Sequence, residues 1–447
     1  MIIRQGGKRM YPLTNRIADL SMIWKQVSQV FPYFDQRKID WDQLYNDYLS
    51  KVINAETEVD FHLLLARFVN ELKDGHTDYS LPRALQDERG YLPFSLKLIK
   101  DTYCIDAAIS SLTPFVRQPV IAINGVPFTD FIHALTQYCY HVDAYIPAYR
   151  IRHFLPFMLK PQGNVLETPL GTASFDLLPQ RPENLTPQSL ELDTPYQAIN
   201  QGKLDIRLYE NNLLYVRLDD FMYSGAADEV RAAISQTPNI AGIIIDLREN
   251  IGGMTMHGAA IAKLLISGAF HACNKRTRSM TGIALSSSSQ LIRWSEKDIA
   301  QHIAAGYATR EEIDESFSYM ENKHFDRYVD TYGHQEHTAL FTGPCVLLTS
   351  RHTLSAAEDF VAMFRTNQRA TIIGTHTSGT TGTPLLQTLS CGGFLRVCSV
   401  GYQLLDGTEF IGHGIAPDQQ CEISLADYQR GYDYVLQQGL EALKKQK

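Results

Sequence analysis

The sequence has few of the features that mark membrane proteins, disulfide scaffolds or nucleic-acid-binding proteins. It contains no run of about eighteen apolar residues, and its first ten residues lack the apolar stretch of a signal peptide. Its seven cysteines are an odd number without C-x-x-C spacing, which excludes a zinc knuckle of that type and a simple disulfide framework. The net charge of -8 comes without a basic stripe, which argues against a nucleic-acid partner.

These absences predict a chain with no transmembrane segment. The sequence as printed predicts a cytoplasmic protein, or an exported one if a leader was removed. His334 and His337 are three residues apart with no further ligands nearby in the sequence, so we predict neither a metal site nor a cofactor. The composition leaves the oligomeric state open. With 447 residues, 44% of them hydrophobic and 20% charged, the chain has the size of about two to three globular domains.

Apolar periodicity divides the chain into three parts. Residues 1–75 form an expected helical cap, since apolar residues recur at helical spacing from Leu13 to Lys73 and Gly75 is placed to end the last helix in the left-handed conformation. Residues 76–200 show short strands, with an Asn124-Gly125 hairpin turn and a polar linker over 181–201. Residues 201–447 alternate strands with helices, which is typical of an α/β core, with an insertion at about 268–340.

The segment from Thr349 to Phe360 is central, because an apolar strand ends there and an amphipathic helix begins. Ser355 stands at that helix start, where unpaired backbone N–H groups and the helix dipole can stabilise an oxyanion. We interpret Ser355 as a nucleophile. A second interpretation fits the same residues, since Ser355 and Glu358 also have the spacing of a capping box.

A serine nucleophile needs a base and donors for the oxyanion. Position suggests the backbone N–H of Ala356 as one donor, and Gly252 or Gly253, which follow a buried strand, as the other. No lysine occurs between Lys323 and Lys444, which excludes a downstream Ser-Lys pair unless the last few residues fold back. Four histidines remain as candidate bases, and position alone does not choose among them: His76, His352, His376 and His413.

Several stretches, in this order, resemble the tail-specific or C-terminal-processing serine peptidases of family S41. They include Trp24 and the Ile39-Asp-Trp41 region, Lys73-Asp-Gly-His-Thr77, Val120-Ile-Ala-Ile-Asn-Gly125, Ile244-Ile-Asp-Leu-Arg-Glu-Asn-Ile-Gly-Gly253, Thr353-Leu-Ser-Ala-Ala-Glu358, Ile373-Gly-Thr-His-Thr-Ser-Gly379 and Gly412-His-Gly-Ile-Ala-Pro-Asp418. The resemblance implies a ClpP/crotonase-like α/β core preceded by a partial PDZ-like β-rich region. It also implies a serine endopeptidase that cleaves unstructured or C-terminal polypeptide segments.

The resemblance also selects a base. In the Ser-Lys branch of the family a lysine stands beside the glycine that is Gly379 here, but this chain has Thr380; the branch similar to the tricorn core peptidase takes its base from a histidine that maps onto His76. Many relatives carry a glutamate where this chain has Ile411, so Glu409 is the expected acid beside His76, with Asp74 or Glu358 as alternatives. A non-catalytic protein that binds peptides or hydrophobic ligands on the same scaffold is the competing hypothesis.

Overall fold

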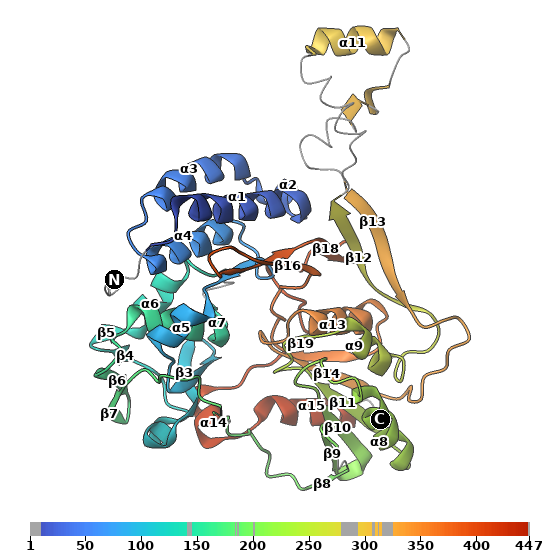
Figure 1. Cartoon of the computed structure of the whole chain (residues 1–447). Helices are drawn as coiled ribbons and strands as arrows, with labels where there is room; N and C mark the ends of the chain where they lie inside the picture. Colours follow the sequence, from blue (N-terminus) through green and yellow to red (C-terminus); the bar gives the residue numbers. More distant parts are fainter. Residues whose placement is uncertain are drawn as a thin grey trace.

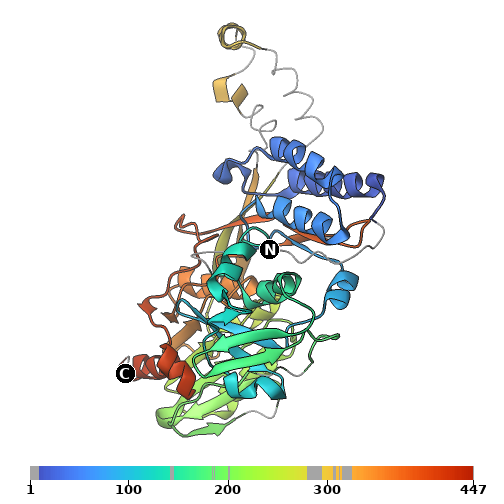
Figure 2. The ribbon, with the colours of Figure 1, turned by 90° about the vertical axis from the view of Figure 1, so that its left-hand side faces the viewer.

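Four helices lie together at one end of the body in the computed structural model, which describes residues 10–445 except 141–144, 184, 186, 200–201, 279–293, 306–308, 312 and 315–324. The helices are α1 (Leu13–Val30), α2 (Phe34–Arg37), α3 (Trp41–Ile53) and α4 (Glu58–Asn70). Asp40 caps α3 and Thr57 caps α4, each through a side-chain oxygen that accepts a backbone N–H. The predicted helical region is confirmed, and Figure 2 shows it from a second side, at one end of the body.

The end of α4 differs from the prediction in its backbone conformation. The left-handed residue is Lys73, with φ 51°, and Gly75 is not among the residues with positive φ. A glycine is needed at position 75 for another reason, because a Cβ there would lie 2.2 Å from Cγ2 of Thr380. The small residue thus serves a close approach between two parts of the chain rather than a helix end.

The β-rich region follows and packs onto the same helices. Its elements are β1 (Asp78–Ser80), α5 (Arg83–Arg89), β2 (Phe94–Ile99), β3 (Thr102–Ala108), β4 (Ala122–Ile123), β5 (Val126–Pro127), α6 (Phe128–Leu135), α7 (Ala148–Phe154), β6 (Asn164–Thr168) and β7 (Gly171–Phe175). Asn124 and Gly125 both have positive φ, as the predicted hairpin turn requires. Buried side chains of this region, of the helices and of a late hairpin form one hydrophobic cluster, so these parts share a core.

A seven-stranded sheet forms the centre of the C-terminal half, in the order β19-β15-β14-β11-β10-β9-β8. Its strands are β8 (Tyr196–Ala198), β9 (Asp205–Tyr209), β10 (Leu213–Arg217), β11 (Gly242–Asp246), β14 (Cys345–Thr349), β15 (Thr371–Gly374) and β19 (Gln419–Gln420). The five from β10 to β19 are parallel, whereas β9 pairs antiparallel with both β10 and the edge strand β8. The expected linker over 181–201 therefore contains β8, which belongs to this sheet.

Helices cover both faces of this sheet. Ile243, Ile245 and Leu347 face α8 (Ala226–Gln236), α9 (Thr255–Ala262) and α13 (Ala356–Thr366) in one buried cluster. Ile244, Val346 and Leu348 face α15 (Tyr434–Lys445), which follows the short α14 (Leu425–Arg430), in another. Because both faces are covered, β11 and β14 read as continuous apolar runs instead of alternating ones. The predicted α/β architecture is confirmed as a mixed α/β fold.

Two smaller sheets connect the halves. β16 (Pro384–Thr388) and β17 (Phe394–Cys398) form a hairpin, and β17 pairs antiparallel with β1 from the N-terminal half. Within the insertion, β12 (Phe270–Arg278) pairs with β13 (Phe325–Tyr332) and also with β18 (Val400–Leu404). The insertion's helix α11 (Glu296–Ala304) lies apart from the body (Figures 1 and 2).

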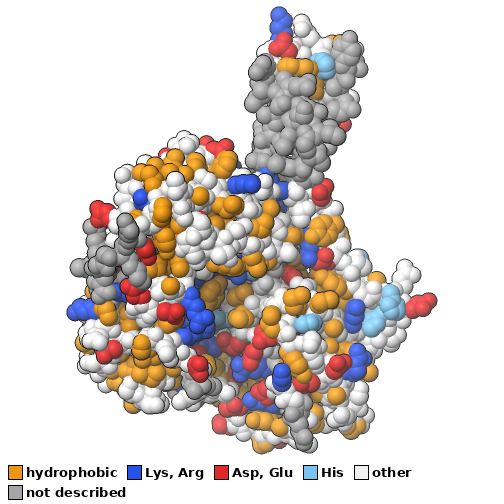
Figure 3. All heavy atoms as spheres, viewed as in Figure 1, with side chains coloured by type: hydrophobic (Ala, Val, Ile, Leu, Met, Phe, Trp, Pro, Cys, Tyr) orange, Lys and Arg blue, Asp and Glu red, His pale blue; other side chains and the backbone are white. Residues whose placement is uncertain are grey.

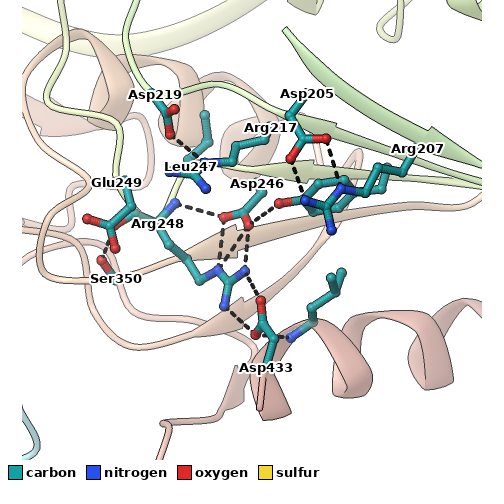
Figure 4. A network of polar contacts seen from close by, with 12 residues as sticks. Asp205, Arg207, Arg217, Asp219, Asp246, Leu247, Arg248, Glu249, Ser350 and Asp433 are labelled. Carbon is teal, nitrogen blue, oxygen red and sulfur yellow. Dashed lines mark hydrogen bonds and ion pairs between the residues drawn. The ribbon is translucent and has the colours of Figure 1, made fainter. Parts of the chain in front are cut away.

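A buried ionic network fixes the end of β11. The guanidinium of Arg248 donates to both carboxylate oxygens of Asp433, at 2.7 and 2.8 Å, and to Asp246, while Tyr215 also donates to Asp246 (Figure 4). The Ser350 hydroxyl donates to the Arg248 carbonyl at 2.5 Å. These contacts tie the segments after β11 and β14 to the start of α15.

We expect Asp433→Asn to destabilise the protein by about 2 kcal/mol, because it weakens the two charge-assisted hydrogen bonds from the buried Arg248 guanidinium, which among the described residues keeps only Asp246 as a carboxylate partner. Asp219→Asn is the matched control: Asp219 pairs with Arg217 but its side chain is 58% exposed, against 5% for Asp433. Exposed pairs contribute less than about 1 kcal/mol. Urea unfolding followed by circular dichroism measures both variants, and equal losses would contradict a structural role for the buried network.

Candidate active site

Ser355 lies between the carboxyl end of β14 and the first turn of α13. Its backbone has φ 58° and ψ -130°, which a non-glycine residue rarely adopts, and its side chain makes no capping hydrogen bond. Glu358 contacts other groups, because its carboxylate accepts from the Thr377 hydroxyl and from the N–H groups of Gly379 and Thr380. The capping-box interpretation of Ser355 and Glu358 is therefore wrong, and the Ser355 hydroxyl has no structural partner in the helix.

Two neighbouring loops hold this strained residue in place. The N–H of Leu354 donates to the Asn250 carbonyl at 3.1 Å, and the N–H of Ser355 donates to the Thr380 carbonyl at 2.9 Å. Glu358 stiffens the second loop through its three accepted hydrogen bonds, although burial raises the pKa of this carboxyl to about 7. The carboxyl ends of parallel strands, where these loops meet, are the usual ligand side of such sheets.

His76 approaches the serine from the N-terminal half, in the turn between α4 and β1. Its Nε2 lies 3.2 Å from Ser355 Oγ. His76 is 3% exposed, and burial, assisted by the charge of Arg396, lowers the pKa of His76 to about 3. The imidazole is thus neutral at pH 7 and able to accept a proton. Among the four candidate histidines, all of them described, this is the one that lies within hydrogen-bonding distance of the serine.

Asp78 is a functional candidate that the sequence reasoning missed. It stands two residues after His76 on β1, forms ion pairs with Arg150 and Arg396, and is the carboxylate whose charge raises the pKa of His76 against the effect of burial. Arg396 also donates to the Gly75 carbonyl at 3.5 Å. Strand alternation could have pointed to Asp78, since residues i and i+2 of an extended segment face the same side.

The expected acid beside His76 is not where the sequence placed it. Glu409 is exposed, and its carboxylate accepts from Gln36 at 3.0 Å and from Gln403 at 3.1 Å. The family position of the glutamate holds Ile411, whose side chain packs against both large hydrophobic clusters. Of the two alternatives, Glu358 binds the loop near Thr380, and Asp74 is buried close to His76 in the chain, where burial raises its pKa.

Two of the predicted oxyanion donors, Gly252 and Ala356, lie beside the serine. Gly252 has φ 94°, and a Cβ at that position would lie 2.6 Å from Cβ of Ser355 and 3.0 Å from the Ala356 nitrogen. The Gly252 N–H, however, donates to Oδ1 of Asn250 at 2.9 Å. Ala356 is the first residue of α13, so its N–H has no intrahelical partner. For Gly253, no bond of its N–H is recorded within the described part of the chain.

Comparisons with known proteins point to one family of peptidases. The model of peptidase family S41 matches residues 212–421, and that of the tricorn protease C1 domain matches residues 14–70. A carboxy-terminal-processing protease of Bartonella bacilliformis is 33% identical over 93 residues, which is 21% of this chain and 21% of that protein. The chain belongs to peptidase family S41.

Solved structures of other S41 peptidases share the fold. Mature CPAF in complex with lactacystin superposes with a TM-score of 0.67 at 14% identity, over 97% of this chain and 98% of that one. The photosystem II D1 C-terminal processing protease gives a TM-score of 0.50 at 15% identity, over 94% and 98%. The predicted family is confirmed, whereas the ClpP/crotonase-like and PDZ-like descriptions of its two parts stay predictions.

Within the described residues, no three His, Cys, Asp or Glu side chains are grouped so as to hold a metal ion. His337 contacts the Lys263 carbonyl at 2.6 Å instead of a metal partner. No helix among the described residues is both long and apolar enough to cross a membrane.

Proposed function

We propose that the chain is a serine endopeptidase that cleaves unstructured or C-terminal segments of polypeptides through an acyl-enzyme. The observation that carries this proposal is the 3.2 Å contact between Ser355 Oγ and His76 Nε2, made at a serine with a strained backbone and no other side-chain task. Family membership supports the reaction class. The proposed substrate class rests on the family resemblance. The proposed catalytic pair rests on that resemblance and on the contact between Ser355 and His76.

In the proposed reaction, Ser355 Oγ attacks the scissile carbonyl carbon while His76 Nε2 accepts the hydroxyl proton. The negative charge on the carbonyl oxygen is stabilised by the N–H groups of Ala356 and Gly253, which lie at the start of α13 and in the glycine loop. His76 then gives the proton to the leaving amine, which departs with the C-terminal part of the substrate. Water, activated by the same histidine, hydrolyses the ester on Ser355.

The direct test is labelling of the purified protein with a fluorophosphonate probe and location of the label by mass spectrometry. We expect the label on Ser355, and none after the protein has been unfolded in urea, because only the folded site activates the hydroxyl. A folded protein that is not labelled under any condition would favour the competing binding-protein hypothesis and would overturn the proposal.

The pH dependence of labelling gives a second readout of the same experiment. An ordinary histidine base would lose its proton-accepting form below about pH 6.5. Because burial lowers the pKa of His76 to about 3, labelling is expected to persist to about pH 4. If labelling instead fell as the pH dropped through about 6.5, the base would be another, more exposed group.

Loss of the fold limits the range of this measurement. His76 and His62 both have a pKa of about 3 when folded, so between about pH 6.5 and 3 the unfolded state binds protons that the folded state does not. Their contribution therefore lowers stability as the pH falls through that window. Circular dichroism at each pH separates the loss of folded protein from protonation of the base.

A further inference from the structure

His76, the candidate base, lacks the acid that the family pattern places beside it. Ile411 stands at the position of the family glutamate and packs among apolar side chains, and Glu409 is exposed and accepts from two glutamines. The Nδ1 atom of His76 is buried, and no hydrogen-bond partner for it lies within the described part of the chain. In a serine–histidine pair this second nitrogen is normally oriented by a carboxylate. Another residue of this chain therefore has to supply that charge.

Asp78, two residues after His76, is an acid that the fold holds firmly in place. Its carboxylate forms ion pairs with Arg150 of α7 and Arg396 of β17. The antiparallel pairing of β1 with β17 sets Asp78 directly opposite Arg396. The three side chains are 13%, 9% and 27% exposed, in the order Asp78, Arg150 and Arg396, so water screens their charges only weakly. We call these three residues the Asp78 cluster.

The Asp78 cluster adjoins the turn that carries the candidate base. Arg396 donates to the Gly75 carbonyl at 3.5 Å. Two members of the cluster, Asp78 and Arg150, line a cavity of about 30 Å³. The residues on either side of the histidine, Gly75 and Thr77, belong to the same wall. In so confined a place, with little room for water, one charge has a strong effect on the protonation of the ring.

The titratable groups around the histidine differ in charge. Burial disfavours ionisation of Asp78, but the charges of Arg150 and Arg396 outweigh burial and lower the pKa of this carboxyl to about 2. Burial raises the pKa of Asp74, which precedes the histidine by two residues, and the pKa of the Cys398 thiol, which lies near the ring. Asp78 therefore keeps a negative charge at neutral and mildly acidic pH, whereas burial works against charge on Asp74 and Cys398.

The members of the Asp78 cluster act on the histidine with opposite signs. Burial is the largest cause of the low pKa of His76, and both arginines add to it. The charge of Asp78 opposes them. The arginines thus favour the neutral ring that accepts the proton of Ser355, and Asp78 stabilises the positive ring that exists after this transfer. Asp78 thereby supplies the charge for which Ile411 offers no group.

We propose that Asp78, clamped between Arg150 and Arg396, takes the place of the family glutamate and supports His76 as the base. The inference rests on the proposed peptidase function, in which Ser355 is the nucleophile. Asp78 is a positioning residue, because it acts on the reacting atoms through His76 and not by contact with them. The two arginines have a separate task, since they keep Asp78 ionised and limit how readily the ring takes a proton before the reaction.

The first test measures cleavage of a fluorogenic peptide pool. Asp78→Asn removes the charge and keeps the shape of the side chain, so kcat is expected to fall about tenfold to a hundredfold while KM changes little. Glu409→Gln, which neutralises an exposed acid near the family position, is the matched control and should change neither constant. An unchanged kcat in Asp78→Asn, or a loss that appears mainly in KM, would overturn the inference.

A second variant separates charge from folding, because Asp78→Asn leaves two arginines without the acid between them. Asp78→Asn/Arg396→Gln restores the net charge of the cluster and is expected to recover about threefold or more of the kcat lost in Asp78→Asn. Arg396→Gln alone should move the acid limit of cleavage upward by about one pH unit, because it removes a charge that opposes protonation of His76. Circular dichroism selects the variants and pH values at which the protein is folded. Losses that multiply in the double variant, or an unmoved acid limit, would contradict the proposed role.

Nuclear magnetic resonance separates this inference from the proposed function, because it needs no turnover. In protein labelled with nitrogen-15 at histidine, the His76 signals are identified by their absence from His76→Gln, and they report which ring nitrogen carries the proton. We expect the proton on Nδ1 at neutral pH, and a change of these signals in Asp78→Asn but not in Asp74→Asn. That result supports Asp78 even if no peptide is cleaved, and then only the peptidase proposal fails. Unchanged His76 signals in Asp78→Asn, or an equal change in Asp74→Asn, reject Asp78 while cleavage at Ser355 stands.

Discussion

Replacing Ser355 or His76 by alanine is expected to lower kcat/KM for peptide cleavage about 10,000-fold or more, and the double variant should be no worse than either single one. In the proposed mechanism the two side chains form one nucleophile–base unit, so removing either member removes the activated hydroxyl. If the two residues acted independently, the losses in kcat/KM of the two single variants would instead multiply in the double variant. Cleavage of a fluorogenic peptide pool by the three variants and the wild type measures this cycle.

The control for this cycle is His413→Ala, which removes an exposed histidine from the glycine-rich stretch that packs near Gly379. We expect activity within about twofold of the wild type, as for most surface substitutions. Unfolding curves of all variants exclude loss of structure as the cause. If His76→Ala kept most of the activity while Ser355→Ala abolished it, the base would be another group.

Gly252→Ala is expected to reduce kcat more than about a hundredfold, the effect of displacing an oxyanion donor, and to destabilise the protein by about 1–3 kcal/mol. The new Cβ would lie 2.6 Å from Cβ of Ser355 and 2.9 Å from the Leu354 carbonyl, and φ is 94°. Either Ser355 or the glycine loop must then move. Both movements disturb the geometry between the hydroxyl, His76 and the Ala356 N–H.

Gly163→Ala is a matched control, because Gly163 also has positive φ, 68°, but nothing lies within 4 Å of an added Cβ. It should lose about 1 kcal/mol of stability, from backbone strain alone, and keep its activity. Activity assays and urea unfolding of the two variants separate strain from steric conflict. Similar activity in both variants would show that the close approach of Gly252 to Ser355 is not needed for catalysis.

Local patterns predicted the elements, and part of the site, from the sequence. The apolar runs of β11 and β14 and the helical face after Ser355 are features of single segments, so periodicity was enough to find them. His76 could not be selected in that way, since its approach to Ser355 depends on the packing of two halves of the chain. The family resemblance supplied what the spacing of residues left open.

The misplaced residues show why the rest could not be predicted. The prediction of Glu409 rests on its nearness in the chain to the family glutamate position at Ile411, but its carboxylate accepts a hydrogen bond from Gln36, a residue on another element. The hydrogen bond from Gly252 to Asn250 likewise depends on the shape of one loop. Such arrangements have no signature in the spacing of residues along the chain.

The pairing of β1 with β17 has a consequence for the time at which this protein acquires its activity. His76 and Ser355 are 279 residues apart, and the strand that follows His76 completes its sheet only with β17, which leaves the ribosome after Ser355. Because synthesis proceeds from the N-terminus, the proposed proton acceptor is made early but stays without the proposed nucleophile until most of the chain has emerged. With this pair as the catalytic one, as proposed, a nascent chain does not cut itself or its neighbours until β17 has paired with β1.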